Sequence, residues 1–138
     1  MHMLTHMRDE AQPNQQKCDG GSGAGCDNLG VIYEDGRGNE GRAIQLYKQG
    51  CDNGGARDCT LLGDMYAKGR GVAKDEGRAA RLYKQGCDGG SAKGCTFLGD
   101  LYARGKGVAK DVERATRLYK RGCDGGSFAG CAAIHGGW

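Results

Sequence analysis

Eight cysteines at regular intervals constrain this chain more than any other feature of its sequence. They form four pairs, and seven residues separate the two members of each pair. The second, third and fourth pairs recur every 36 residues, and the first pair begins 33 residues before the second. A fixed period in this range is typical of stacked supersecondary units. The eight positions are Cys18, Cys26, Cys51, Cys59, Cys87, Cys95, Cys123 and Cys131.

Each repeat contains two segments with helical periodicity, which we call helix A and helix B. In helix A, residues of the same kind recur at offsets of 0, 3, 4, 6 and 7, as in Cys59, Leu62, Gly63, Met65 and Tyr66. In helix B, the offsets are 0, 3, 4, 7 and 8, as in Ala79, Leu82, Tyr83, Gly86 and Cys87. Each pattern describes one buried helix face. The sequence therefore predicts an all-α fold, a right-handed α/α superhelical solenoid of antiparallel helix pairs.

Residues that favour helix ends stand at the borders of these segments. Short polar side chains that can cap free N–H groups precede the helices, and we expect caps for helix B from Asn39, Asp75 and Asp111, and for helix A from Ser22, Ser91 and Ser127. Gly55 occupies the cap position of the second hairpin. The Gly-x-Gly elements after helix A favour helix termination through positive φ; they are Gly36/Gly38, Gly69/Gly71 and Gly105/Gly107.

Glycine accounts for 28 of the 138 residues, and much of it recurs with the repeat. A glycine inside a helix costs about 1 kcal/mol relative to alanine. Gly30, Gly63 and Gly99 lie inside helix A, and we therefore expect a neighbouring helix to cross closely over each of them.

Charge and hydropathy exclude several classes of protein. The net charge of +3 comes from 20 basic and 17 acidic side chains, which is too balanced to favour a nucleic-acid partner. No run of about 18 apolar residues is present, so the sequence predicts no membrane span. Residues 1–17 match helix B poorly and lack the apolar core of a secretory signal. We expect this segment to be a degenerate cap or cloning residues, poorly ordered, with an original signal already removed.

The cysteine pairs have three chemical interpretations. Antiparallel helices packed about 8–10 Å apart can bring two facing cysteines within disulfide range. In that interpretation, we expect the seven residues between the two cysteines to form a tight hairpin loop. Structural zinc usually takes cysteines two to four residues apart in groups of four, which this spacing does not provide, and we expect neither metal nor cofactor. Free buried thiols in a reducing compartment are the third interpretation.

The repeated residues resemble the Sel-one-like repeat family, an α/α relative of the tetratricopeptide solenoids. The motifs that carry the resemblance are LGDMYAKGRGV at 62–72, AARLYK at 79–84, and GCDGG at 86–90 followed by GC at 94–95. The cysteine pairs are similar to those of its cysteine-rich bacterial subgroup, the Hcp-type proteins. The resemblance implies a single domain over 18–135, with about three full repeats and a final half repeat, followed by a tail at 136–138.

The resemblance also implies one disulfide in each hairpin and residence in the periplasm or outside the cell. The implied bonds join Cys18 to Cys26, Cys51 to Cys59, Cys87 to Cys95, and Cys123 to Cys131.

A stacked array presents a long concave surface lined mainly by its A helices. Positions on helix A that differ between repeats, while the packing positions stay constant, are candidates for ligand contact. We therefore predict a monomeric scaffold that binds a peptide or protein partner in this groove. The candidate residues are Asn28, Val31, Leu61, Asp64, Lys68, Phe97, Asp100 and Arg104.

The resemblance implies an enzymatic alternative, because cysteine-rich members have been described as penicillin-binding proteins or weak β-lactamases. Its ligand would be a β-lactam or a cell-wall fragment. The only serines are Ser22, Ser91 and Ser127, and none begins a Ser-x-x-Lys motif. No Lys-Thr-Gly is present either, and we assign no catalytic residue.

Overall fold

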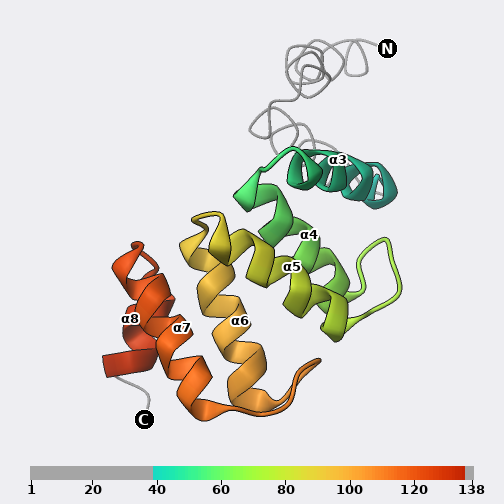
Figure 1. Ribbon diagram of the computed structural model, residues 1–138. Coiled ribbons are helices and arrows are strands. Elements are labelled where there is room, and N and C mark those ends of the chain that lie inside the picture. The colour runs from blue at the N-terminus through green and yellow to red at the C-terminus, as the bar shows by residue number, and fades with distance from the viewer. Residues whose placement is uncertain (1–38, 136–138) are drawn as a thin grey trace.

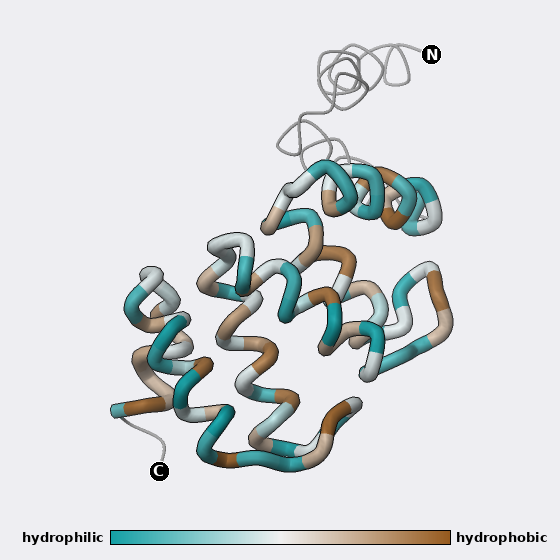
Figure 2. The backbone as a smooth tube through the Cα atoms, in the orientation of Figure 1, coloured by the Kyte–Doolittle hydropathy of each residue, from teal (hydrophilic) through white to brown (hydrophobic). Residues whose placement is uncertain are grey.

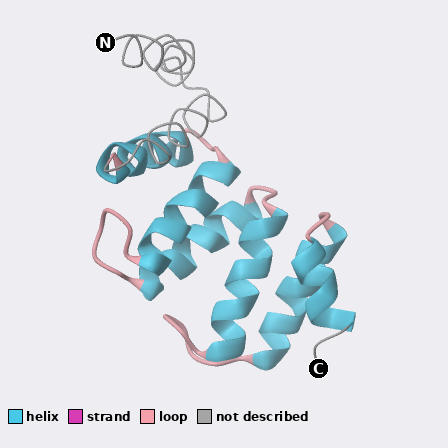
Figure 3. Ribbon diagram, turned by 180° about the vertical axis from the view of Figure 1, so that it is seen from behind, coloured by secondary structure: helices cyan, strands magenta, loops and turns pink. Residues whose placement is uncertain are grey.

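The computed structural model describes residues 39–135, and every regular element within that range is an α-helix (Figures 1 and 3). The predictions made for Ser22, Asn28, Gly30, Val31 and the Cys18–Cys26 bond lie outside the described residues. The helices are α3 (Glu40–Asp52), α4 (Ala56–Lys68), α5 (Glu76–Asp88), α6 (Ala92–Arg104), α7 (Val112–Asp124) and α8 (Phe128–His135).

The six helices form a stack of antiparallel hairpins, in which each helix packs against the next one along the chain (Figure 1). Helices α4, α6 and α8 are the A helices, and α3, α5 and α7 are the B helices. The A helices also contact each other, α4 with α6 and α6 with α8. No comparable contact joins α3 to α5 or α5 to α7. The predicted all-α solenoid of helix pairs is confirmed, and its A helices form the more closely packed layer.

Short polar side chains begin most of the helices, as predicted. Asp75 and Asp111 have extended backbones and accept hydrogen bonds from the backbone N–H groups of Arg78 and Arg114, at 2.9 and 3.0 Å. The cap predicted at Asn39 is wrong, because its side chain makes no capping hydrogen bond to α3. Its backbone (φ −95°, ψ 26°) lacks the extended conformation that a capping residue normally has.

The A helices end at glycines in the left-handed region, as the Gly-x-Gly elements predict. Gly69 after α4 has φ 67°, and Gly105 after α6 has φ 65°. The N–H of the next residue then reaches back into the last helical turn, as Arg70 does to the Met65 carbonyl. This geometry ends helix A abruptly and sends the chain into the connection that leads to helix B.

The core consists of small and apolar side chains between the helices. Figure 2 shows that apolar and polar residues alternate along the helices, as expected when only one face is buried. Tyr47 and Tyr83 are almost fully buried, each beside a buried leucine of an A helix, Leu62 and Leu98 respectively. The buried faces predicted for helices A and B are therefore observed.

Gly63 and Gly99 allow a tyrosine ring of the following B helix to pack directly on an A helix. A Cβ atom at Gly63 would lie 2.8 Å from Cδ1 and Cε1 of Tyr83, and one at Gly99 would lie 2.9 Å from the same atoms of Tyr119. Real Cβ atoms essentially never approach other atoms so closely. The close crossing predicted from the cost of these glycines is confirmed for both residues.

Three disulfides join the last turn of a B helix to the first turn of the next A helix: Cys51–Cys59, Cys87–Cys95 and Cys123–Cys131. The hairpin loop predicted over all seven intervening residues is wrong. Only three residues lie between the helices, as at 53–55, because both cysteines are within helical turns. The disulfide therefore clamps two helix ends directly.

Candidate functional site

The layer of A helices carries two equivalent hollows, one repeat apart. The first, of about 450 Å³, lies between α4 and α6 and is lined by Arg57, Thr60 and Leu61 on one side and by Gly90 and Lys93 on the other. The second, of about 400 Å³, lies between α6 and α8, with the lining displaced by 36 residues. We call the surface formed by these two hollows the A-helix groove.

Each hollow combines an apolar side chain with a cation one helical turn away. Leu61 and Arg57 provide this pair in the first hollow, and Phe97 and Lys93 provide it in the second. Phe97 is half-buried; its ring centroid is 5.5 Å from that of Tyr83, and the ammonium of Lys93 lies 5.7 Å from the Phe97 ring centroid. An occupant would therefore meet an apolar surface whose shape the core fixes, with a positive charge at its edge.

The end of the groove carries the most exposed large apolar side chain among the described residues. Phe128 in α8 is 87% exposed and lines the second hollow. Phe128 was not predicted as a groove residue, although a comparison of the repeats distinguishes it, because Ala56 and Ala92 occupy the equivalent positions.

Asp64 and Asp100, both predicted as groove residues, bond to tyrosines of the following B helices. The hydroxyl groups of Tyr83 and Tyr119 donate to Oδ1 of Asp64 and Asp100, each at 2.6 Å. Burial and these hydrogen bonds raise the pKa of both tyrosines far above the ordinary value. Neither aspartate lines one of the two hollows, so each ties an A helix to its B helix beside the groove.

The remaining predicted groove residues in the described range lie farther along the A helices. Lys68 and Arg104 are exposed in the last turns of α4 and α6. They share a helix stripe with Leu61 and Phe97, seven residues earlier, but they line neither hollow. Leu61 and Phe97 therefore line the hollows. Lys68 and Arg104 lie about two turns farther along α4 and α6 and do not.

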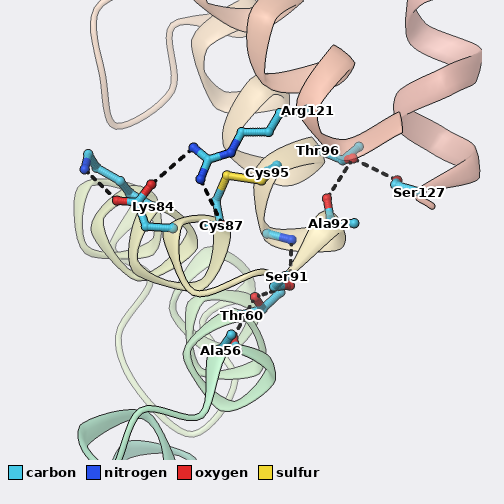
Figure 4. The surroundings of a disulfide bond; sticks show 12 residues. Ala56, Thr60, Lys84, Cys87, Ser91, Ala92, Cys95, Thr96, Arg121 and Ser127 are labelled. Carbon is cyan, nitrogen blue, oxygen red and sulfur yellow. Dashed lines mark hydrogen bonds and ion pairs between the residues drawn. A yellow bond between two sulfur atoms is a disulfide. The ribbon is translucent and has the colours of Figure 1, made fainter. Parts of the chain in front are cut away.

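Hydroxyl groups on the floor of the groove connect successive repeats. The Thr60 hydroxyl is hydrogen-bonded to the Ser91 hydroxyl at 2.8 Å and to the Ala56 carbonyl oxygen at 3.1 Å (Figure 4). Ser91 also accepts the N–H of Gly94 at 3.0 Å and so caps α6. The same arrangement recurs around Thr96 and Ser127. Both serines thus act in capping and packing, and within residues 39–135 neither has a lysine or histidine among its hydrogen-bond partners.

Two further features concern the described residues as a whole. None of the helices within 39–135 combines the length and hydropathy needed to cross a bilayer. In the same range, no three His, Cys, Asp or Glu side chains are grouped in a way that could hold a metal ion.

The geometry defines a class of α/α hairpin-repeat proteins with one disulfide clamp per hairpin. The family model of the Sel1 repeat matches residues 23–55, 56–91 and 92–127. The chain therefore belongs to the Sel1 repeat family, as the sequence resemblance indicated. A comparison with curated proteins finds no match.

Solved structures share this fold over most of the chain. A Sel1 repeat protein from Oxalobacter formigenes has 24% identity and a TM-score of 0.83, covering 93% of this chain and 54% of its own. Cysteine-rich protein B of Helicobacter pylori has 26% identity and a TM-score of 0.78, covering 93% of this chain and 94% of its own. A protective antigen of uropathogenic Escherichia coli with an SLR fold has 23% identity and a TM-score of 0.81, covering 89% of this chain and 27% of its own. This chain thus spans about half of the first protein and nearly all of the second.

Proposed function

We propose that this protein is a peptide-binding module whose ligand lies along the A-helix groove, across α4, α6 and α8. Sel1 repeat scaffolds are consistent with a role in protein binding. The observation that carries the proposal is the repetition of one hollow, with an apolar side chain and a cation, at two successive repeats.

The chemistry of the hollows specifies the kind of peptide. Leu61 and Phe97 each offer an apolar surface, and Phe128 adds an exposed ring to that surface in the second hollow. Arg57 and Lys93 favour carbonyl or carboxylate oxygens close to the apolar contacts. We therefore expect an extended segment with apolar side chains at two positions, about one A-helix spacing, or roughly 8–10 Å, apart.

The disulfides indicate where such binding would take place. All six cysteines in the described range are paired within their own hairpins, and disulfides persist in oxidising compartments. An oxidising compartment outside the cytosol follows from these bonds. Among oxidising compartments, we propose that the protein acts in the periplasm or outside the cell after secretion.

A selection from a displayed random-peptide library on the immobilised oxidised protein tests the proposal. We expect enrichment of peptides that carry apolar residues, and binding of the enriched peptides should weaken at least tenfold with Lys93→Glu. This substitution reverses the charge of a side chain that lines both hollows and keeps its Cβ and Cγ methylenes. Lys106→Glu reverses an exposed charge outside both hollows and serves as the matched control.

Two results would overturn the proposal. One is a selection that enriches nothing above the level of a blank surface. The other is a set of enriched peptides that bind wild-type protein and the Lys93→Glu variant equally well.

A further inference from the structure

The helices opposite the A-helix groove enclose a second depression. Three hollows share lining residues along α5: the first contains Arg81 and Lys84, the second shares Arg81, and the third shares Lys84. They therefore form one continuous surface from α3 across α5 to α7, which we call the B-helix groove. Its two larger hollows have volumes of about 440 and 350 Å³.

These two larger hollows are repeats of one another. The floor of the hollow between α3 and α5 consists of Leu62, Tyr66 and Leu82. The residues 36 positions later form the floor of the hollow between α5 and α7. The side chains of both floors are half-buried or buried. Each hollow lies between two B helices, with an A helix beneath it. Since α4 and α6 contact each other, the two floors are about one helix spacing, or roughly 10 Å, apart.

Cations outnumber carboxylates around both floors, with three cations to Asp52 in the hollow between α3 and α5 and four cations to Asp88 in the hollow between α5 and α7. Arg78 lies 5.1 Å from the Tyr66 ring centroid and donates to the Tyr66 hydroxyl at 3.1 Å, and Arg114 repeats this on Tyr102 at 5.1 and 3.2 Å. The aromatic rings thus hold these two guanidinium groups in place at the edge of the groove.

Two further arginines in the groove are not neutralised. Arg81 and Arg117 line the two larger hollows, are exposed, and form no ion pair or hydrogen bond with any residue of the described range. Their guanidinium groups present forked donors that match a carboxylate in geometry.

A carboxylate of the chain itself already occupies part of this groove. Asp88 bonds to Lys84 at 2.9 Å through Oδ2 and to Arg121 at 3.2 Å through Oδ1 (Figure 4 shows Lys84 and Arg121). The hydrogen bond from Lys84 is the main cause that lowers the pKa of Asp88. These contacts show how the cations of the groove hold an anionic oxygen pair.

We propose that the B-helix groove binds an acidic peptide segment whose aliphatic side chains sit on the two leucine floors while its carboxylates pair with Arg81 and Arg117. A polyproline II segment rises about 3.1 Å per residue and places every third side chain on one face. Three residues therefore span the distance between the floors, so the ligand carries an aliphatic residue at every third position with Asp or Glu between them. This surface is distinct from the A-helix groove.

The floors favour a peptide over a nucleic acid. Single-stranded nucleic acid binds through exposed aromatic rings on which bases stack. Here one face of each groove tyrosine, Tyr66 and Tyr102, is covered by an arginine. The apolar surface left for a ligand belongs mainly to leucine, which suits an aliphatic side chain.

Fluorescence polarisation with a labelled peptide of four Glu-Leu-Glu units tests this proposal on the oxidised full chain. We expect saturable binding that weakens with added salt and that falls at least tenfold when Gln replaces Glu in the peptide. The double variant Arg81→Gln, Arg117→Gln should lose at least tenfold in affinity. Circular dichroism of each variant verifies that the exposed substitutions leave the helices intact.

A double variant with the same net charge separates a specific groove from general electrostatic attraction. Lys106→Gln with Lys110→Gln removes two exposed cations from the connection between α6 and α7, and it should bind the peptide as wild type does. Equal losses in the two double variants would overturn the proposal. So would the absence of saturable binding, or tighter binding of a single-stranded thymidine oligonucleotide that Arg81→Gln, Arg117→Gln abolishes.

Discussion

The hydroxyl groups of Thr60 and Ser91 lie 2.8 Å apart and join helix α4 to the capping residue of helix α6. Because Ser91 also caps α6 through the Gly94 N–H, this contact links the capping of one repeat to the packing of the preceding one. Thr96 and Ser127 repeat the link at the next boundary. Such contacts couple neighbouring repeats in an array whose stability depends on nearest-neighbour interfaces.

Replacing Thr60 with valine keeps the shape of the side chain and removes its hydroxyl. Since partly buried polar groups then lose a partner, we expect Thr60→Val to lower the free energy of unfolding by about 1–2 kcal/mol. Thr60→Ser retains the hydroxyl and should lose less. Urea unfolding followed by circular dichroism measures both, and equal stability of wild type and Thr60→Val would show that the link contributes nothing.

Tyr83 and Tyr119, the tyrosines that bond to Asp64 and Asp100, should make the protein lose stability at alkaline pH. Their pKa values are raised in the folded state, whereas an unfolded tyrosine ionises near pH 10. The stabilisation is therefore complete below about pH 10 and is lost above it, by about 1.4 kcal/mol per pH unit for each tyrosine, until the folded tyrosines ionise.

Tyr83→Phe tests this origin of the pH dependence. The variant also loses the hydrogen bond to Asp64, so we expect it to be less stable than wild type by about 1.5–3 kcal/mol at neutral pH. Above pH 10 its stability should fall less steeply with pH than that of wild type. Unfolding curves between pH 8 and 11.5 provide the comparison, and parallel declines for the two proteins would refute the assignment.

Two glycine-to-alanine substitutions should act in opposite directions. Gly63→Ala places a Cβ against the buried Tyr83 ring and should cost about 1–3 kcal/mol through overpacking. Gly41→Ala lies in α3 with nothing within 4 Å of the new Cβ, and it should gain up to about 1 kcal/mol from helix propensity. Thermal unfolding of both variants measures the difference, and destabilisation of similar size in the two would contradict the close-crossing explanation.

Each disulfide should stabilise the array by restricting the unfolded chain. For a closed loop of about nine residues, the loop-entropy relation gives about 2.5 kcal/mol. We expect Cys87→Ser with Cys95→Ser to lower the free energy of unfolding by about this amount, and full reduction to lower the melting temperature much further. An unchanged melting curve after reduction would disprove the clamping role of the disulfides.

Much of this fold could be predicted because its determinants are local and repeat. The period of the cysteines, the helix faces, and the glycine crossings at Gly63 and Gly99 are visible in the order of residues. A buried polar group was not predicted. Asp58 is 1% exposed, and a side chain at Gly50 would collide with it. A comparison of the repeats does distinguish this position, because Gly94 and Gly130 are the equivalent residues in the later repeats.

The candidate surfaces were less predictable because they depend on how helices pack. Asp64 and Tyr83 are 19 residues apart, and only the crossing of α4 with α5 brings them together. The B-helix groove was missed because three helices form each of its larger hollows. Its recurring cations, such as Arg81 and Arg117, were nevertheless visible in the repeat alignment.

The most direct test of the proposed function is to map a library-selected peptide onto the isotope-labelled, oxidised full chain by amide chemical-shift perturbation. We expect the largest shifts to cluster around Leu61 in α4 and Phe97 in α6, and to extend to Phe128. Perturbations confined to α5 and α7, or spread evenly over all the helices, would contradict binding in the A-helix groove.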